Sequence, residues 1–211
     1  MHMIKILQLP LGPLQTNCYL LGCEETMEAA IIDPGWNGRS IAATADEQGW
    51  FITHILLTHS HFDHVGGLAE LKAEANAPIY IHPEAVEMLQ MATMSAAFYQ
   101  LTIPSPPPPD IMLTDGEVLR VGNLELHVLY TPGHAPGHVS FYLPEQGVLF
   151  DGDVLFQQGI GRTDLPGGDH KLLMQTILQK LMTLPNETHV LSGHGPATTI
   201  GNERQWNPFL Q

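Results

Sequence analysis

The sequence predicts a single-domain protein of mixed α/β class. Its 211 residues fall within the range of one large domain, and 44% apolar with 14% charged residues is ample for a buried core. Two further observations indicate the class. Short strands rich in Ile and Leu, separated by Pro and Gly turns, lead into a helical pattern, and this order occurs twice along the chain. We therefore expect one globular domain spanning residues 1–211.

The first half is predicted to begin as a β-meander and to continue into a helix. Asp33, Pro34 and Gly35 end its third strand, and Gly49 ends the helix that follows. The expected elements are strands at 4–9, 18–21 and 29–33, a helix at 39–48, a strand at 51–58, a helix around 68–75 and a strand at 79–82.

Residues 84–110 differ from their surroundings and are predicted to form a helix followed by a stiff, Pro-rich excursion. The helix carries a stripe of large apolar side chains, namely Met88, Met91, Met94, Phe98 and Tyr99. Such a stripe is often core packing, and the prolines at 104 and 106–109 could also bind a proline-recognising module. We favour a lid or insertion over the active site, because Met adapts to varied ligand shapes and long insertions often serve as lids.

The second half repeats the order of strands and then a helix. Strands are expected at 117–121, 124–130, 138–143 and 148–150, and a helix at 170–184 with Asp169 as its N-cap. The halves also echo each other in sequence, since Asp33 and Asp151 each follow a strand, and His59 and His194 each follow another. If the echo is real, each half supplies one acidic and one histidine strand end to a shared seam.

Charge and composition exclude several classes of partner. Eight Lys and Arg against 22 Asp and Glu give a net charge of −14, which would repel both nucleic acid and an anionic membrane surface. Two cysteines are too few for a disulfide framework, so a reduced compartment is expected. No signal peptide and no apolar stretch approaching 18 residues is evident, and we expect a cytoplasmic protein.

The segment 58–64 is predicted to bind metal, because it places three imidazoles and a carboxylate within six positions. His59 and His61 point the same way in an extended segment, and a turn near Phe62 can direct Asp63 and His64 to a second point nearby. This spacing suits two metals. In the alternative interpretation, Asp63 only caps a helix that begins at Val65, and the histidines are surface residues.

Three further segments resemble ligand loops, each with a His or Asp beyond a strand and a glycine that lets the backbone approach closely. They are residues 131–134, 151–153 and 192–195. Together with the 58–64 segment, in this order, they resemble the metallo-β-lactamase superfamily. The similarity extends from residues 12–17 to residues 207–210, and it implies a four-layer αββα sandwich with the metals at one edge of the facing sheets.

The resemblance also implies a ligand set. His59, His61 and His134 would hold the first metal, Asp63, His64 and His194 the second, and Asp153 would bridge the two. Asp33 and Asp151 are interpreted as supporting or turn residues. The other histidines are interpreted as structural or surface residues: His2, His54, His82, His127, His138, His170 and His189.

The chemistry implied is hydrolysis by a metal-bound hydroxide. Two divalent ions, two ligating carboxylates and a hydroxide leave the site at +1, which favours an anionic or carbonyl substrate. Zinc is the expected metal, with iron or manganese as alternatives, because zinc lowers the pKa of bound water to about 7. Asp63 would orient the hydroxide and take its proton.

Residues 149–156 and 159–164 are similar to the hydroxyacylglutathione hydrolase (glyoxalase II) branch, especially its short bacterial members. Arg162 matches a basic position that contacts glutathione there, and Phe98 and Tyr99 are further candidates for substrate contact. Asp164 departs from the pattern, because longer enzymes carry a tyrosine there. The chain also ends at Gln211 without their C-terminal extension. We expect a small-molecule thioester substrate, such as S-D-lactoylglutathione or a related 2-hydroxyacyl thioester.

Other functions remain open. Persulfide dioxygenases share the fold and the Gly-Arg-Thr-Asp run at 161–164, and their single iron would take His59, His134 and Asp153. Lactonase or β-lactamase activity is a further alternative. A nuclease is disfavoured by the few Lys and Arg residues, and a binding module by the complete set of ligand positions. The oligomeric state is not predicted.

Overall fold

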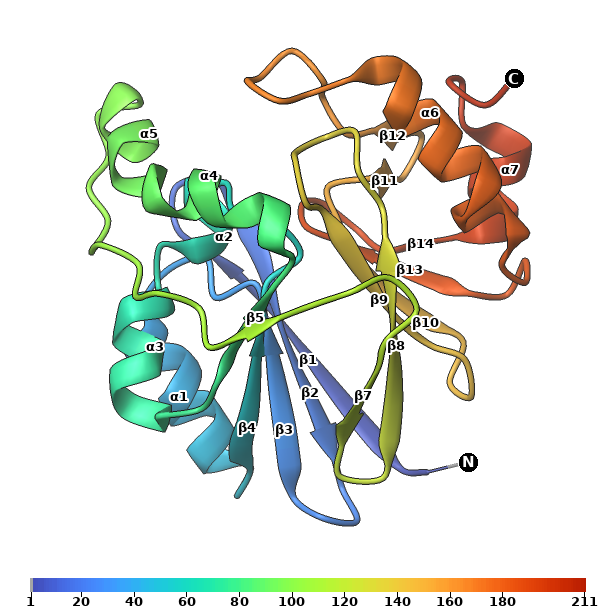
Figure 1. Ribbon diagram of the computed structural model, residues 1–211. Coiled ribbons are helices and arrows are strands. Elements are labelled where there is room, and N and C mark those ends of the chain that lie inside the picture. Colours follow the sequence, from blue (N-terminus) through green and yellow to red (C-terminus); the bar gives the residue numbers. More distant parts are fainter. Residues whose placement is uncertain (1) are drawn as a thin grey trace.

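The computed structural model describes residues 2–211 as two facing β-sheets with helices on the outer side of each. In Figure 1, α1 and α3 cover the outer face of one sheet, and α6 and α7 lie on the outer side of the other. This is the four-layer αββα sandwich, so the predicted mixed α/β single-domain fold is confirmed. Among residues 2–211, no helix has the length and apolarity needed to cross a bilayer.

The first sheet has the strand order β1-β2-β3-β4-β5-β6. Its first three strands form the predicted antiparallel meander, and β3 to β6 then run parallel. The strands are β1 (Ile4–Leu11), β2 (Thr16–Cys23), β3 (Glu28–Ile32), β4 (Phe51–Leu56), β5 (Ile79–Ile81) and β6 (Ile111–Met112). Strand β4 ends two residues earlier than predicted, so His59 stands three residues beyond its end instead of directly after it.

The second sheet has the order β14-β13-β10-β9-β8-β7, and a separate two-stranded hairpin is made by β11 and β12. The strands are β7 (Val118–Val121), β8 (Leu124–Tyr130), β9 (Val139–Leu143), β10 (Val148–Gly152), β11 (Leu155–Phe156), β12 (Gly159–Ile160), β13 (His189–Ser192) and β14 (Thr198–Thr199). Strand β10 pairs in parallel with β13, as β3 pairs with β4. The sequence echo is therefore structural, since each sheet aligns an acidic strand end with a histidine strand end.

The helices of the outer layers are short. They are α1 (Gly38–Glu47), α2 (Phe62–Val65), α3 (Leu68–Ala75), α4 (Val86–Gln90), α5 (Ala92–Phe98), α6 (His170–Gln179) and α7 (Ile200–Trp206), with 3₁₀ turns η1 (Pro83–Ala85) and η2 (Leu181–Thr183). The predicted helix at 170–184 is wrong at its end, because it breaks at Lys180 into η2. Its predicted cap is confirmed, since the Asp169 carboxylate accepts a hydrogen bond from the backbone N–H of Leu172.

Three hydrophobic cores separate the four layers. Strand β2 shows how one strand serves two of them, because side chains alternate across a sheet. Cys18 and Leu20 pack with Ile41 and Leu71 of the outer helices, whereas Tyr19 and Leu21 pack between the sheets. The third core joins β10 and β13 to α6 and α7 through Leu149, Val190, Leu173, Ile177 and Ile200. The core between the sheets fixes their separation and hence the edge at which the metal ligands meet.

The segment 84–110 is helical up to residue 98 and then extended without strand pairing as far as residue 110. Its large apolar side chains do not form a core. Met94 is 61% exposed and Phe98 84% exposed, while the helices bury Leu89, Ala92 and Ala96 instead. The core-packing alternative is therefore wrong for the exposed members of the stripe: Met91, Met94, Phe98 and Tyr99.

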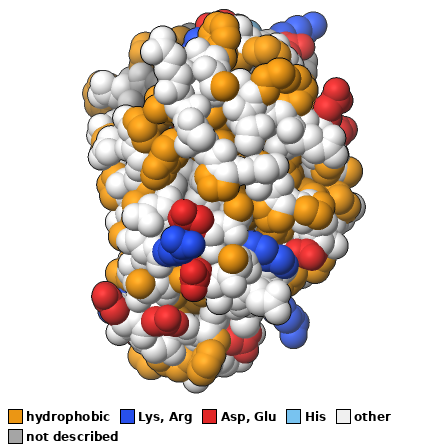
Figure 2. Space-filling model, turned by 90° about the vertical axis from the view of Figure 1, so that its left-hand side faces the viewer, with side chains coloured by type: hydrophobic (Ala, Val, Ile, Leu, Met, Phe, Trp, Pro, Cys, Tyr) orange, Lys and Arg blue, Asp and Glu red, His pale blue; other side chains and the backbone are white. Residues whose placement is uncertain are grey.

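Figure 2 views the molecule from the side of α1, α3 and α5. Lys and Arg side chains on this face are few and scattered, and apolar side chains are spread over it. Two of the bases of these helices bind acidic neighbours: Arg39 Nε lies 3.4 Å from Glu74 Oε1, and Lys72 Nζ lies 2.8 Å from Asp110 Oδ2. On this face of the described chain, no continuous basic patch forms.

Candidate metal centre

All seven predicted ligands meet at one edge of the facing sheets. His59 and His61 follow β4, and Asp63 and His64 lie in the single-turn helix α2. The second sheet supplies the rest from three loops, with His134 between β8 and β9, Asp153 after β10 and His194 after β13. Helix α3 has Gly67 as its N-cap and no side-chain cap, so the alternative in which Asp63 serves only as a helix cap is wrong.

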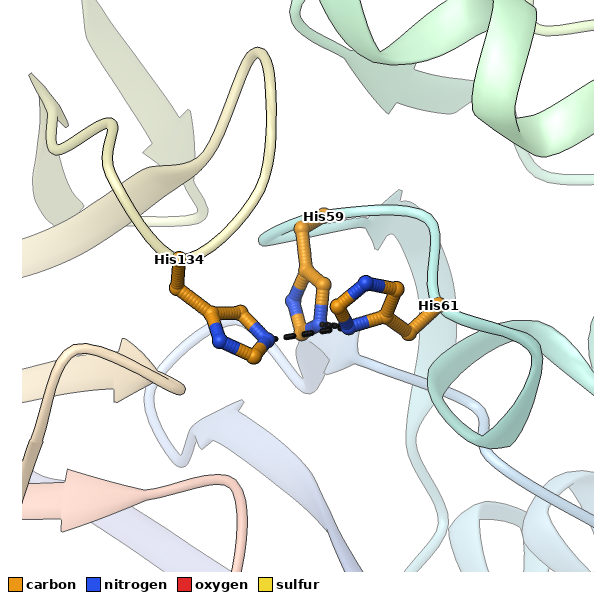
Figure 3. A group of neighbouring side chains, drawn as sticks. All are labelled: His59, His61 and His134. Atoms are coloured by element: carbon orange, nitrogen blue, oxygen red, sulfur yellow. Dashed lines mark hydrogen bonds between the residues drawn. The ribbon is translucent and has the colours of Figure 1, made fainter. Parts of the chain in front are cut away.

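His59, His61 and His134 point their ring nitrogens at one place, as Figure 3 shows. His61 Nδ1 lies 3.1 Å from His59 Nε2 and 2.9 Å from His134 Nε2. Imidazoles this close, in perpendicular pairs, present three lone pairs to a common point. Three neutral histidines converging in this way are typical of a zinc or iron site.

Asp63, His64 and His194 form a second group of converging ligand atoms. Asp63 Oδ2 lies 3.1 Å from His194 Nε2 and 3.6 Å from His64 Nε2. It also accepts a hydrogen bond of 2.8 Å from the hydroxyl of Thr16. The Asp63 carboxylate is thus held in place by a residue of the first sheet while it faces two imidazoles.

Asp153 lies between the two groups. Its Oδ2 is 3.5 Å from His134 Nε2 and 3.7 Å from His194 Nε2, and its Oδ1 is 3.5 Å from His64 Nε2. One carboxylate therefore faces a histidine of the first group and two of the second. This is the arrangement that a bridging ligand requires.

Each of four imidazoles of the candidate ligand set has a partner on its Nδ1 atom. His64 Nδ1 lies 3.0 Å from Asp33 Oδ2, and His59 Nδ1 lies 3.0 Å from the hydroxyl oxygen of Thr58. The two others contact backbone carbonyls, His134 Nδ1 at 2.8 Å from that of Arg162 and His194 Nδ1 at 3.2 Å from that of Leu14. Such partners fix the tautomer and leave Nε2 free to bind metal.

Asp33 also lies near His59 and His64, but its oxygens are already used. Oδ1 accepts a hydrogen bond of 2.8 Å from the backbone N–H of Thr58, and Oδ2 accepts one of 2.6 Å from the Thr58 hydroxyl and faces His64 Nδ1. Asp33 therefore orients two ligand-bearing segments and does not itself face the centre. Its backbone is left-handed, with a φ of 51°.

Electrostatics divides the centre into a neutral and a charged half. Burial lowers the pKa of His59 well below its usual range, and burial together with His134 lowers the pKa of His61 to about 4. In the second group burial opposes the shift, but Asp153 and Asp63 raise the pKa of His64 well above its usual range. Burial raises the pKa of Asp63, yet His64 and the hydrogen bond from His194 outweigh it and lower that pKa to about 2.

The residues present fit a pair of metal ions. His64 Nε2 and Asp153 Oδ1 are buried and have no hydrogen-bond partner, which is costly unless a ligand satisfies them. A Cβ atom on Gly193 would lie 2.2 Å from Asp153 Oδ1 and 2.6 Å from His64 Cε1, so only glycine leaves these atoms free. Nitrogen and carboxylate donors suit zinc, iron and manganese.

The predicted substrate contacts are connected to this centre through His134 and Phe62. The backbone carbonyl of Arg162 holds His134, while its side chain is exposed and bound to Asp164. The ring of Tyr99 lies 5.3 Å from that of Phe62, the residue between His61 and Asp63, and 5.5 Å from that of Phe98. Their contact with substrate stays a prediction.

Sequence reasoning did not single out several residues that shape the centre. Thr16 holds Asp63, while Asn17 Nδ2 and Tyr19 Oη donate hydrogen bonds of 2.9 and 2.7 Å to the carbonyl of Ser192, just before His194. The sequence did offer one signal for them. Thr16 and Asn17 are polar residues at the start of an otherwise apolar, buried strand, and buried polar groups require hydrogen-bond partners.

Comparison with known proteins identifies the family. Residues 11–194 match the family model described as the metallo-beta-lactamase superfamily. The chain belongs to this superfamily. Its relatives include "Probable metallo-hydrolase YqgX" of Bacillus subtilis (strain 168), 42% identical over 209 residues and 98% of each chain. They also include "Hydroxyacylglutathione hydrolase GloC" of Haemophilus influenzae, 38% identical over 204 residues and 96% of each chain.

Solved structures support the same assignment. The chain is similar to BLEG-1 B3 metallo-beta-lactamase, with a TM-score of 0.92 at 43% identity, covering 98% of this chain and 100% of that one. It is also similar to TTHA1623 in a di-iron-bound form, with a TM-score of 0.89 at 44% identity, covering 97% and 100%. The resemblance found in the sequence is confirmed, and the chain is a metallo-hydrolase by family.

Proposed function

We propose that the protein hydrolyses 2-hydroxyacyl thioesters, such as S-D-lactoylglutathione, with two divalent metal ions, zinc in the first place. The observation that carries this proposal is the place of Asp153, whose carboxylate lies between a group of three histidines and a group made by Asp63, His64 and His194. Bound there, two ions would lower the pKa of a water molecule and polarise the carbonyl group under attack.

The exposure of the ligands gives the direction of substrate approach. His59 and His64 are fully buried, whereas the side chain of His194 is 30% exposed and that of Asp63 is 13% exposed. The thioester carbonyl therefore enters on the side of His194. The hydrogen bond from Thr16 leaves Asp63 oriented to position the attacking water and accept its proton.

The choice of a thioester rests on similarity and on Arg162. The relative GloC carries the name hydroxyacylglutathione hydrolase and matches 96% of this chain. The backbone carbonyl of Arg162 is joined to the centre by its contact with His134, and its exposed guanidinium is a candidate to bind a carboxylate of the thiol portion. The second candidate function is β-lactam hydrolysis, favoured by the similarity to BLEG-1 B3 metallo-beta-lactamase. For a persulfide dioxygenase, one iron held by His59, His134 and Asp153 would leave four ligand candidates without a role: His61, Asp63, His64 and His194.

Parallel assays of one protein preparation test the proposal. Zinc-loaded protein is given S-D-lactoylglutathione and free thiol is followed, while iron-loaded protein is given glutathione persulfide and oxygen uptake is followed. We expect thiol release that is lost in Asp153→Ala and retained in His170→Ala, a matched change of an exposed residue. Oxygen uptake without thiol release would replace the hydrolase by a dioxygenase. Activity on a lactone or β-lactam only would move the assignment to those carbonyls.

A further inference from the structure

His138 is a buried imidazole beside the metal centre that the ligand set does not use. It is fully buried, and its ring stacks on that of His59 with centroids 5.0 Å apart and an interplanar angle of 27°. His138 belongs to none of the groups of converging ligand atoms. Its Nε2 lies 3.2 Å from the backbone nitrogen of Asp153, the residue between the two ligand groups.

The hydrogen bonds around His138 admit one consistent direction. The backbone N–H of Asp153 can only donate, so His138 Nε2 must carry no hydrogen and Nδ1 must carry it. Nδ1 then donates to the hydroxyl of Thr131 at 2.9 Å, which leaves that hydroxyl to donate to Ser140 Oγ at 2.9 Å. The hydroxyl of Ser140 donates in turn to Asp151 Oδ1 at 2.8 Å.

Asp151 ends this chain as an acceptor on both oxygens. Its Oδ2 accepts a hydrogen bond of 2.8 Å from the backbone N–H of Leu155. Thr131, Ser140 and Asp151 are all fully buried, so water does not compete for these bonds. Every donor in the chain finds an acceptor, and the Asp153 N–H at its other end fixes the direction in which the bonds run.

The backbone that His138 contacts is the turn that carries Asp153. Pairing of β10 with β13 shifts register between Phe150 and Gly152, so the sheet ladder does not by itself fix the next residue. Gly152 has a φ of 53°, and a Cβ there would lie 2.6 Å from His138 Nε2. The imidazole therefore packs directly against the turn, and no side chain larger than hydrogen fits between them.

We propose that His138 is a positioning residue for the bridging carboxylate of Asp153. Held as the Nδ1–H tautomer by Thr131, Ser140 and Asp151, its bare Nε2 fixes the Asp153 amide so that the carboxylate faces both groups of ligands. The proposal rests on the two-metal assignment under Proposed function. Because one carboxylate serves both ions, a loosened turn weakens both of them, and loss of a ligand's supporting partner typically costs about 10- to 100-fold in metal affinity.

Substitution of Thr131 tests the chain without removing a ligand. Thr131→Val keeps the side-chain shape but leaves His138 Nδ1 without an acceptor, and Thr131→Ser restores the hydroxyl. Zinc affinity is measured by competition with a chromophoric chelator. We expect Thr131→Val to bind both zinc ions about 10- to 100-fold more weakly than the native protein, and Thr131→Ser to retain most of the native affinity.

Thr198→Val is the matched control. Thr198 is also a buried threonine, and its hydroxyl donates to Glu203, away from the metal ligands. Loss of that bond should lower the melting temperature and leave zinc affinity unchanged. Equal loss of zinc affinity in Thr131→Val and Thr198→Val would mean that general destabilisation, not positioning, is responsible, and would overturn the proposal.

The tautomer supplies a readout that requires no metal. Nitrogen-15 NMR of the metal-free protein should show His138 neutral with the proton on Nδ1, and that proton should be lost to exchange in Thr131→Val. A proton on Nε2 would overturn the proposal whatever the metal content.

A second pair of variants applies if Thr131→Val does not fold. The amide oxygen of His138→Gln can accept a hydrogen bond from the Asp153 N–H, so this variant should bind zinc more tightly than His138→Leu. Equal zinc affinities of the two variants would overturn the proposal. A single zinc in the native protein would instead refute the two-metal assignment, while the tautomer still reports on His138.

Discussion

The guanidinium of Arg162 donates two hydrogen bonds to the carboxylate of Asp164, from Nε to Oδ1 at 2.8 Å and from Nη2 to Oδ2 at 2.7 Å. These bonds raise the pKa of Arg162 and lower the pKa of Asp164 to about 2, so the pair is ionised and carries no net charge at neutral pH. A carboxylate of the thiol portion of a substrate must therefore compete with Asp164 for this guanidinium.

Asp164→Asn should release Arg162 for the substrate. We expect KM for S-D-lactoylglutathione to fall about two- to fivefold, the range typical of an exposed ion pair, with kcat little changed. Steady-state kinetics with a second 2-hydroxyacyl thioester whose thiol is uncharged is the comparison. The double variant Asp164→Asn with Arg162→Ala should lose the gain. An equal fall in KM for both thioesters would mean that the Arg162 guanidinium does not bind a carboxylate of the substrate.

Phe98 and Tyr99 should shape the substrate specificity of the protein. They are 84% and 46% exposed, and the ring of Tyr99 packs on Phe62 within the ligand segment. Replacing both with Ala should raise KM for thioesters with apolar acyl or thiol groups and leave zinc content unchanged, because neither contacts a ligand atom. Unaltered kinetics on every accepted thioester would show that the exposed stripe is an ordinary surface. Met3→Ala, which changes an exposed apolar residue just before β1, is the matched control.

The metal centre was predictable because its signal is local. His59, His61, Asp63 and His64 lie within six positions, and the remaining ligands each stand beside glycine after a strand. The residues that orient these ligands carry no such signal. Thr16 and Asp63 are 47 positions apart, and His194 and the carbonyl of Leu14 are 180 apart, so only the packing of the two sheets brings them together.

The fold was likewise predictable where the sequence signal is local. The longer strands, such as β2, β3 and β10, are apolar runs bounded by turn residues, whereas β6, β11, β12 and β14 have two residues each, too few for any such run. The break of the last long helix at Lys180 was also missed, because the apolar spacing continues through Leu181 into the 3₁₀ turn. The interpretation of His138 as a structural residue followed from its single position, which says nothing of its contact with Asp153.

Two substitutions should separate the roles of the ligating carboxylates. Asp153→Ala removes the carboxylate that faces both groups, so both zinc ions should bind more weakly. Asp63→Ala should weaken only the ion held with His64 and His194. Metal analysis of the purified, zinc-saturated variants gives the stoichiometry, and the native protein should hold close to two ions per chain. One ion in the native protein, with no change in Asp63→Ala, would refute the dinuclear assignment.

Zinc binding should release protons, and those protons should come from one half of the centre. In the metal-free protein burial lowers the pKa values of His59, His61 and His134, so these rings are already neutral at pH 7. His64 and His194 behave oppositely. Burial opposes the shift, but Asp153 and Asp63 raise the pKa of His64, and the hydrogen bond to Asp63 and the charge of Asp153 raise that of His194.

The sign of the pH dependence follows from these shifts. A raised pKa means that His64 and His194 hold protons at pH 7, which a metal must displace, so zinc affinity should rise with pH until it passes their raised pKa values and then level off. Protonated His64 and His194 also stabilise the metal-free fold through their interactions with Asp63 and Asp153. This contribution to the free energy of unfolding is complete below the unfolded histidine pKa of about 6.5, and it is lost as pH rises through the raised pKa values. Calorimetric titration with zinc in two buffers of different ionisation enthalpy measures the protons released. Heats independent of the buffer at pH 7 would contradict the charged half of the centre, since neutral His64 and His194 have no proton to give.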